Sequence, residues 1–163
     1  MGRVIGNLMG RFVPLLLFPY LLSGVDFNLN RIISDANRTD RAIFLFLHKD
    51  NCRFCERAIF DLEKEDISKI VEDRFIFVDI NRDDNETILF QDYNGTTEGF
   101  LKKLGVELYP TLIFLNGDGE FIYRVVGYRN IDRFKNILKY IYTKSYREVT
   151  FEEFEDELQT NKR

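Results

Sequence analysis

The residues best suited to chemistry are Cys52 and Cys55, the only two cysteines of the 163-residue chain. They form a C-x-x-C motif between an apolar strand-like run, Ala42 to His48, and a helix-like stretch, Glu56 to Lys64. A thiol at the start of a helix faces unpaired N–H groups and the positive end of the helix dipole, which favour the reactive thiolate. One helical turn separates the two cysteines, so the second can resolve a mixed disulfide formed on the first. The motif predicts thiol–disulfide exchange, with Cys52 as the nucleophile and Cys55 as the resolving thiol.

Two other uses of the cysteine pair stay open from the residues alone. A structural zinc site usually has four ligands, and the chain offers one histidine, His48, which would need a carboxylate to complete the set. An inert structural disulfide is the second alternative. A bridge across C-x-x-C encloses almost no loop and therefore constrains little of the unfolded chain. We expect a redox-active disulfide, with no metal and no cofactor.

A proline far along the chain supports the redox interpretation. Pro110 is the only proline outside the first 24 residues, and it stands directly before a strand-like run, Thr111 to Leu115. Proline is tolerated at the start of a strand because it lacks the N–H that a central strand needs. Together with the C-x-x-C motif, this arrangement resembles the thioredoxin family over roughly residues 40 to 142. The resemblance implies that Pro110 is a cis-proline and that its loop lies opposite the cysteines.

The resemblance implies an α/β thioredoxin fold, with a central mixed sheet of four or five strands flanked by helices. The hydrophobic patterns predict strands at Ala42 to His48, Phe75 to Ile80, Thr111 to Leu115 and Glu120 to Val126. Besides the helix after the cysteines, they predict helices at Asp26 to Arg38, Asp66 to Asp73, Thr97 to Leu104 and Asp132 to Tyr142.

Two segments add to a minimal fold of this kind. Asn81 to Thr97 is irregular and forms an insertion before the helix that leads to the cis-proline; we expect an extended ribbon at Glu86 to Tyr93 and a turn at Asn94-Gly95. Thr150 to Glu153 fits a capping box that opens an extra C-terminal helix, reaching about Leu158.

The C-terminal part is similar to SoxW-like periplasmic thioredoxins up to about residue 157. The segments that carry this resemblance are Gly127-Tyr128, Phe134, Leu138 to Ile141, Ser145-Tyr146 and Phe151 to Phe154. The resemblance implies an exported oxidoreductase that reduces disulfides of protein substrates and receives electrons from a membrane thiol transporter. An oxidant of the same fold that introduces disulfides, and a non-catalytic binding module, are the alternatives.

The first 24 residues have the pattern of a secretory signal peptide. Arg3 and Arg11 precede an apolar run of 11 residues, Phe12 to Leu22, which ends in the small residues Ser23-Gly24. A membrane span needs about 20 apolar residues. An uncleaved amphipathic anchor and a terminal helix packed on the domain are the alternatives. We expect a signal peptide at 1–24, a single thioredoxin-like domain at 25–163, and a periplasmic or otherwise exported protein.

Charge and composition limit the partners. Removal of Arg3 and Arg11 would change the formal net charge from −4 to −6. An acidic domain without a basic stripe is a poor match for nucleic acid or anionic membranes. Hydrophobic residues make up 45% of the chain, with 16 Phe and 8 Tyr, enough for one sizeable core. We expect a monomer that acts on disulfides of other proteins.

Four residues beside the cysteines are candidate substrate contacts. Arg53 would place a cation next to Cys52 and lower its pKa, or it is a solvated side chain at the helix start. The resemblance implies that Phe54 offers an apolar surface to substrates. It also implies that the backbone of Tyr109, the residue before Pro110, pairs with a substrate strand.

Two positions depart from thioredoxin proper. Asn51 stands where thioredoxin has a tryptophan, and Phe46 stands where it has a buried aspartate. A proton acceptor for Cys55 is therefore not evident, and water, His48 or Glu56 would have to serve. The other interpretation of His48 is a polar group at the end of a strand.

Overall fold

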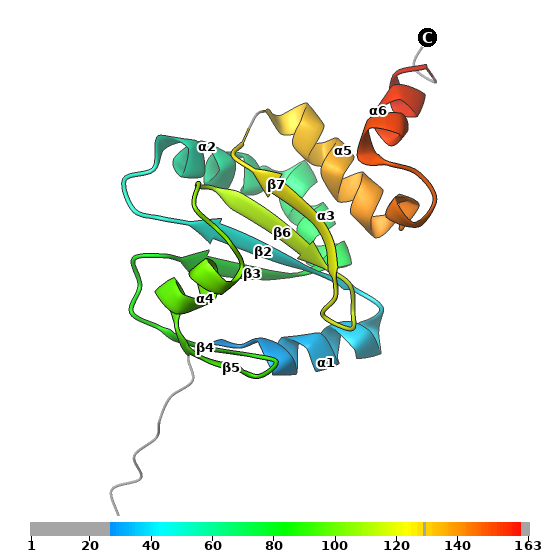
Figure 1. The fold of residues 1–163 in the computed structure, drawn as a ribbon. Coiled ribbons are helices and arrows are strands. Elements are labelled where there is room, and N and C mark those ends of the chain that lie inside the picture. Colours follow the sequence, from blue (N-terminus) through cyan, green and yellow to red (C-terminus); the bar gives the residue numbers. More distant parts are fainter. Residues whose placement is uncertain (1–26, 129, 161–163) are drawn as a thin grey trace, which may run out of the picture.

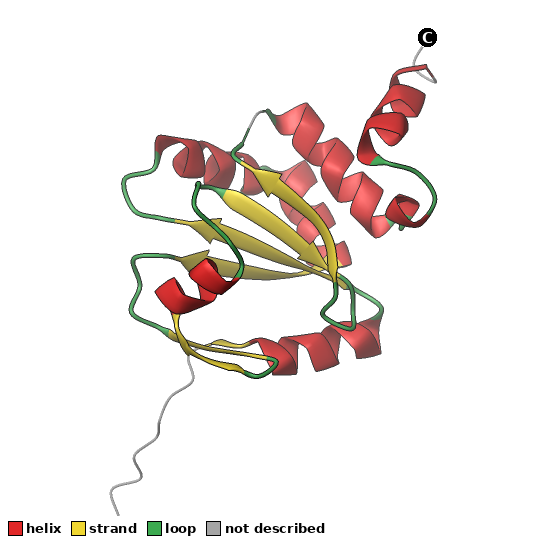
Figure 2. Cartoon of the chain, in the orientation of Figure 1, coloured by secondary structure: helices red, strands yellow, loops and turns green. Residues whose placement is uncertain are grey.

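The computed structural model describes residues 27–128 and 130–160 (Figure 1). The expected signal peptide at 1–24 lies outside these residues. The described part forms a central mixed sheet with helices on both faces (Figure 2). The predicted α/β thioredoxin fold is therefore confirmed.

The central sheet has four strands in the order β3-β2-β6-β7. The inner strand β2 (Ala42–His48) pairs parallel with β3 (Phe75–Asn81) and antiparallel with β6 (Thr111–Leu115). β7 (Phe121–Val126) pairs antiparallel with β6. β3 and β7 are therefore the two edge strands. All four strands lie within one residue of their predicted bounds.

Helices cover both faces of the inner strand. On one face Phe44 and Phe46 pack against α2, α3 and α5, and on the other Ile43, Leu45 and Leu47 pack against α1 and α4. Because both faces are buried, β2 is a continuous apolar run rather than an alternating one. The helices are α1 (Leu29–Thr39), α2 (Arg53–Leu62), α3 (Glu65–Arg74), α4 (Thr97–Lys103) and α5 (Ile131–Tyr142).

The start of the first helix differs from the prediction. We expected it to begin at Asp26, but α1 begins at Leu29, and Phe27–Asn28 form a short strand, β1. The side chain of Asn28 accepts a hydrogen bond from the N–H of Arg31 at 3.0 Å and thereby caps the helix. The chain before this cap is extended because it pairs with strand β4 of the insertion.

The insertion forms a second, smaller sheet in the order β1-β4-β5. β4 (Thr87–Phe90) and β5 (Tyr93–Thr96) are an antiparallel hairpin. The predicted turn at Asn94-Gly95 is wrong, because these residues lie inside β5. The chain reverses at Gln91, which has φ 51° and whose backbone N–H and C=O both bond to the Asn30 side chain.

The extra C-terminal helix is confirmed as α6 (Phe151–Thr160), which follows the 3-10 turn η1 (Ser145–Arg147). The capping box is present: the N–H of Thr150 donates to Glu153 at 2.8 Å, and the N–H of Glu153 donates to the Thr150 hydroxyl at 3.3 Å. Phe151 and Phe154 place their ring centroids 5.4 Å from that of Tyr140 on α5. The helix therefore extends the core on the α5 side of the sheet.

A buried carboxylate ties α2 to the segment after β7. Asp61 has no exposed surface, and it accepts a hydrogen bond from the Tyr128 hydroxyl at 2.9 Å. Lys64 forms an ion pair with it at 2.6 Å. Burial raises the pKa of Asp61, but the contacts with Lys64, Tyr128 and Arg57 outweigh burial and hold the pKa below its usual value. The fold therefore stabilises the charged form of Asp61.

We expect Tyr128→Phe to lower the free energy of unfolding by about 1.5–3 kcal/mol, because a buried carboxylate loses a hydrogen-bond donor. Denaturant unfolding of the disulfide-bonded protein measures this. Tyr146→Phe is the matched control: within the described residues the Tyr146 hydroxyl has no hydrogen bond, so its loss should stay within about 0.5 kcal/mol. Equal losses in the two variants would show that the Asp61 contact contributes nothing.

Candidate active site

The two cysteines are joined by a disulfide at the N-terminus of α2. Cys52 is the N-cap residue of this helix, and its sulfur accepts the N–H of Cys55 at 3.2 Å. Its carbonyl oxygen accepts the N–H groups of Cys55 at 2.9 Å and of Glu56 at 3.0 Å. The first sulfur therefore lies at the positive end of the helix dipole, where a thiolate is stabilised.

The two cysteines differ in accessibility. Cys52 keeps 8% of its surface exposed, whereas Cys55 keeps 1% and faces the core from α2. Both cysteines are largely covered, and Cys52 is the less covered of the two. This difference supports the predicted order of attack and resolution.

The loop with Pro110 lies at the same end of the sheet as the cysteines, where β2 ends. The Tyr109–Pro110 peptide bond is cis, the isomer that the family resemblance implies. Leu47 pairs with Thr111, so Pro110 stands level with the end of β2, from which the loop to Cys52 departs. The ammonium group of Lys49 in that loop lies 6.0 Å from the centroid of the Tyr109 ring. The two loops thus meet beside the disulfide.

Exposed apolar side chains gather at this edge. Phe54 is 59% exposed, Leu108 is 65% exposed, and Val126, which pairs with Thr111, is 50% exposed. Apolar groups left in water near a reactive site are typical of surfaces that bind partners. The sequence predicted Phe54 as a contact but not Leu108, which lies two residues before Pro110, or Val126, which the strand register places beside Thr111. Arg53 is solvent-exposed, with its guanidinium 5.9 Å from the Phe54 ring.

The segment after β3 holds the loop before Cys52 in place. The N–H of Asp50 donates to the carboxylate of Asp83, and the side-chain amide of Asn81 donates to the Asp50 carboxylate, both at 2.9 Å. The N–H of Arg82 donates to the carbonyl of His48 at 2.8 Å. The insertion therefore supports the candidate site from its first residues. Sequence patterns did not predict this role, although the Asx-rich stretch after β3 was a signal for it.

His48 has a partner that the sequence did not predict. Its Nε2 lies 2.8 Å from Oδ1 of Asp79 on β3, and its ring stacks on Phe46 with centroids 5.3 Å apart. Phe46 is fully buried, at the position where thioredoxin has an aspartate. The hydrogen bond with Asp79 raises the pKa of His48, burial opposes this rise, and the net pKa lies above its usual value.

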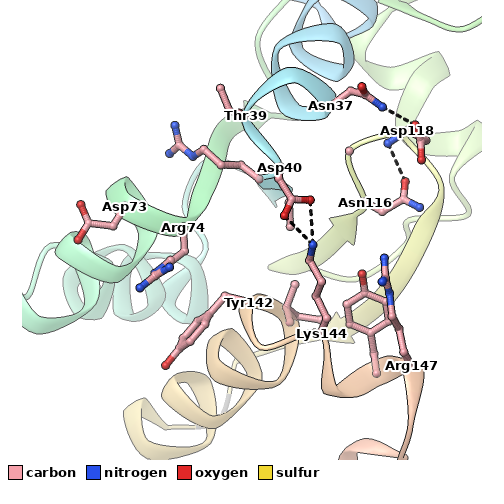
Figure 3. Close-up of a pocket in the computed structure, with 15 residues that line it drawn as sticks. Asn37, Thr39, Asp40, Asp73, Arg74, Asn116, Asp118, Tyr142, Lys144 and Arg147 are labelled. Carbon is pink, nitrogen blue, oxygen red and sulfur yellow. Dashed lines mark hydrogen bonds and ion pairs between the residues drawn. The ribbon is translucent and has the colours of Figure 1, made fainter.

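At the opposite end of the sheet lies a polar pocket whose lining side chains bond to one another (Figure 3). Lys144 reaches across it to both carboxylate oxygens of Asp40 at 2.7 and 2.8 Å, and Asn37 donates to Asp118. Since β2 begins beside this pocket and ends beside the cysteines, about 20 Å separate the two places. The pocket links α1, the β6–β7 turn and the end of α5, and it takes no part in the candidate site.

Among residues 27–128 and 130–160, no three His, Cys, Asp or Glu side chains are grouped as ligands for a metal ion. In the same part of the chain no helix combines the length and the apolar character that a membrane crossing requires.

Comparison with known proteins agrees with the fold. The profile of a family described as Thioredoxin-like domain matches residues 29–142. A thioredoxin-fold protein from Helicobacter pylori superposes with a TM-score of 0.64 at 20% identity, over 75% of this chain and 82% of that chain. A thioredoxin from Thermus thermophilus superposes with a TM-score of 0.56 at 21% identity, over 71% of this chain and 84% of that chain. Oxidized thioredoxin O2 from Arabidopsis thaliana superposes with a TM-score of 0.51 at 20% identity, over 70% of this chain and 86% of that chain. No curated protein sequence matches the chain significantly.

In the reduced protein we expect iodoacetamide to modify Cys52 at least about tenfold faster than Cys55, because the first thiol is more exposed and lies at the helix N-terminus. Peptide mass analysis of samples quenched over time measures the two rates. In denaturant the two rates should converge, which serves as the control. Equal rates in the folded protein, or faster modification of Cys55, would contradict the assignment of the nucleophile.

Proposed function

Since this chain belongs to the thioredoxin-like domain family, we propose that it is a thiol–disulfide oxidoreductase that acts on disulfides of proteins. The observation that carries the proposal is the Cys52–Cys55 disulfide at the N-cap of α2, with its first cysteine less covered than its second and with Pro110 at the same end of the sheet. The placement supplies a thiolate-stabilising helix end, a covered resolving thiol and an exposed apolar rim.

The proposed reaction begins with the reduced pair. The Cys52 thiolate attacks one sulfur of a substrate disulfide, and the other substrate sulfur leaves as a thiolate and takes up a proton. The covered thiol of Cys55 then gives up its proton and attacks Cys52. The substrate leaves as a dithiol, and the protein is left with the disulfide found in the structure. Two electrons have passed from the protein to the substrate, so a second dithiol must reduce the pair again.

Substrate contacts follow from the groups around the disulfide. Phe54 lies between the two cysteines in the chain and Leu108 lies two residues before Pro110, and both offer exposed apolar surface. The backbone of Tyr109 supplies polar groups for an extended substrate segment. An unfolded or flexible chain that carries a disulfide next to apolar residues fits this rim best. Arg53 lies in water beside Phe54 and contributes a positive charge to the same rim.

Net reduction is the proposed direction, with electrons from a membrane thiol transporter, as in the SoxW-like periplasmic thioredoxins that the C-terminal segments resemble. The support for export is the signal-peptide pattern of residues 1–24, with Arg3 and Arg11 before the apolar run. Direction depends on the reduction potential of the cysteine pair, because about 30 mV shifts a two-electron exchange by about 1.4 kcal/mol.

The wild-type protein should reduce insulin disulfides in the presence of dithiothreitol, and Cys52→Ser should abolish this activity. Cys55→Ser should instead accumulate a mixed disulfide on Cys52, visible as a mass increase that a reductant reverses. Ser145→Ala, a change on η1 away from the cysteines, is the control and should leave the rate unchanged. A Cys52→Ser variant that binds protein partners fully, beside a wild type without reductase activity, would favour the binding module.

For the leader we expect cleavage near Gly24-Val25 when the full chain is expressed with an export pathway present. N-terminal sequencing of the protein from the periplasmic fraction measures the cleavage point. Replacing Leu15 and Leu16 by Asp should keep the chain in the cytoplasm uncleaved, because the apolar run is interrupted. An intact N-terminus on exported wild-type protein would contradict the cleaved leader and favour an uncleaved anchor.

A further inference from the structure

His48 shares a face of β2 with the core residues under α2. Side chains alternate along a strand, so Phe44, Phe46 and His48 point to the same side. Phe46 packs in one cluster with Ala58 of α2, and the imidazole of His48 stacks on Phe46. His48 therefore continues, toward the end of the strand, the row of side chains that α2 covers.

The path of the chain brings Cys55 to the same end of this row. After β2 the chain turns back, and α2 runs in the opposite direction over the sheet (Figure 1). Cys55 lies one helical turn before Ala58 on the buried side of α2, and hence nearer to the His48 end of the strand than Ala58. Only three residues separate His48 from Cys52, which keeps the imidazole close to the start of the helix.

We propose that His48, oriented by Asp79, accepts the proton of Cys55 when this thiol resolves the mixed disulfide. The proposal rests on the oxidoreductase function proposed above. Nε2 of His48 lies 2.8 Å from Oδ1 of Asp79, and within the described residues Nδ1 makes no hydrogen bond. With the Nε2 proton directed to the carboxylate, Nδ1 carries the lone pair that accepts a proton. Asp79 is a positioning residue in this scheme.

The step balances without another reagent. The S–H proton of Cys55 passes to Nδ1 of His48, and the Cys55 sulfur forms a bond to the Cys52 sulfur. The bond between Cys52 and the substrate sulfur breaks, and its electron pair leaves with the substrate thiolate. That thiolate takes a proton from the imidazolium or from water, which restores neutral His48.

The groups around His48 make it a stronger base than a free histidine. The hydrogen bond with Asp79 is the main cause of its raised pKa; burial opposes the rise, and the charges of Asp79, Asp84 and Asp50 add to it. These carboxylates come from β3, the loop after β3 and the loop after β2, while the cysteine pair faces it from α2. Because the neutral imidazole is the acceptor, resolution should accelerate as pH rises through a pKa above 6.5.

The test uses the reduced full-length chain and the disulfide probe 5,5′-dithiobis(2-nitrobenzoate). Attack by Cys52 releases one thionitrobenzoate, and resolution by Cys55 releases the second, so stopped-flow absorbance follows the two steps separately. Between about pH 5 and about pH 9 we expect His48→Gln to slow the second release by about 10²-fold and to remove its pH-dependent rise. The first release should change much less, since Cys52 is already the stabilised thiolate.

A second variant separates proton transfer from a structural effect. Asp79→Asn keeps the imidazole but removes the main cause of its raised pKa, so the rise of the second release should shift to lower pH. Asp73→Asn, which changes an exposed carboxylate in the last turn of α3, just before β3 begins, is the control and should keep the wild-type profile. Should His48→Gln fail to fold, the shift in Asp79→Asn decides the question.

The outcomes distinguish the two proposals. If the wild type releases both thionitrobenzoates and the His48 and Asp79 variants keep its pH profile, the role of His48 is wrong while the oxidoreductase stands. If the wild type releases only one, resolution by Cys55 does not occur, and the dithiol mechanism fails together with the role of His48.

Discussion

Burial of β2 on both faces is the constraint on which the rest of the structure depends. Five consecutive residues, Ile43 to Leu47, are buried, so helices must cover both sides and neighbouring strands must flank the strand. The polar end of β2 then lies at the end of the sheet where the chain turns back into α2. This reversal puts the N-terminus of a helix, with its unpaired N–H groups, at the surface beside the end of β6 that carries Pro110. The cysteines at that helix end therefore receive their electrostatic environment from the backbone.

The elements with local signals were predictable from the sequence. The apolar runs of β2 and β6, the cysteine motif at a strand-to-helix corner and the Thr150–Glu153 capping box each depend on residues close together in the chain. Long-range partners were not predictable. β1 pairs with β4, about sixty residues later in the chain. The side chain of Asn30 holds the turn of the β4–β5 hairpin. Likewise, nothing near His48 or Asp61 in sequence announces Asp79 or Tyr128, because the fold alone brings these partners together. A carboxylate on the buried side of α2, at Asp61, was the one available hint.

The two additions to the minimal fold serve different ends of the molecule. The insertion begins with the residues that hold the loop before Cys52, so it belongs to the surroundings of the disulfide. The C-terminal helix α6 lies beyond residue 142, where the family match ends, and packs its two phenylalanines on Tyr140. The insertion therefore contributes to the surroundings of the disulfide, and α6 enlarges the hydrophobic core.

The position of Asp61 near the end of α2 has a mechanical consequence. The contacts of Asp61 with Tyr128 and Lys64 hold α2 about two turns beyond the sulfurs, and the buried Cys55 and Ala58 hold its first half on the core. The contacts of Asp61 do not involve either sulfur, so the pair can open and close without breaking them. Covalent cycling at the N-terminus of α2 is thereby separated from the Asp61 contacts that hold the helix on the domain.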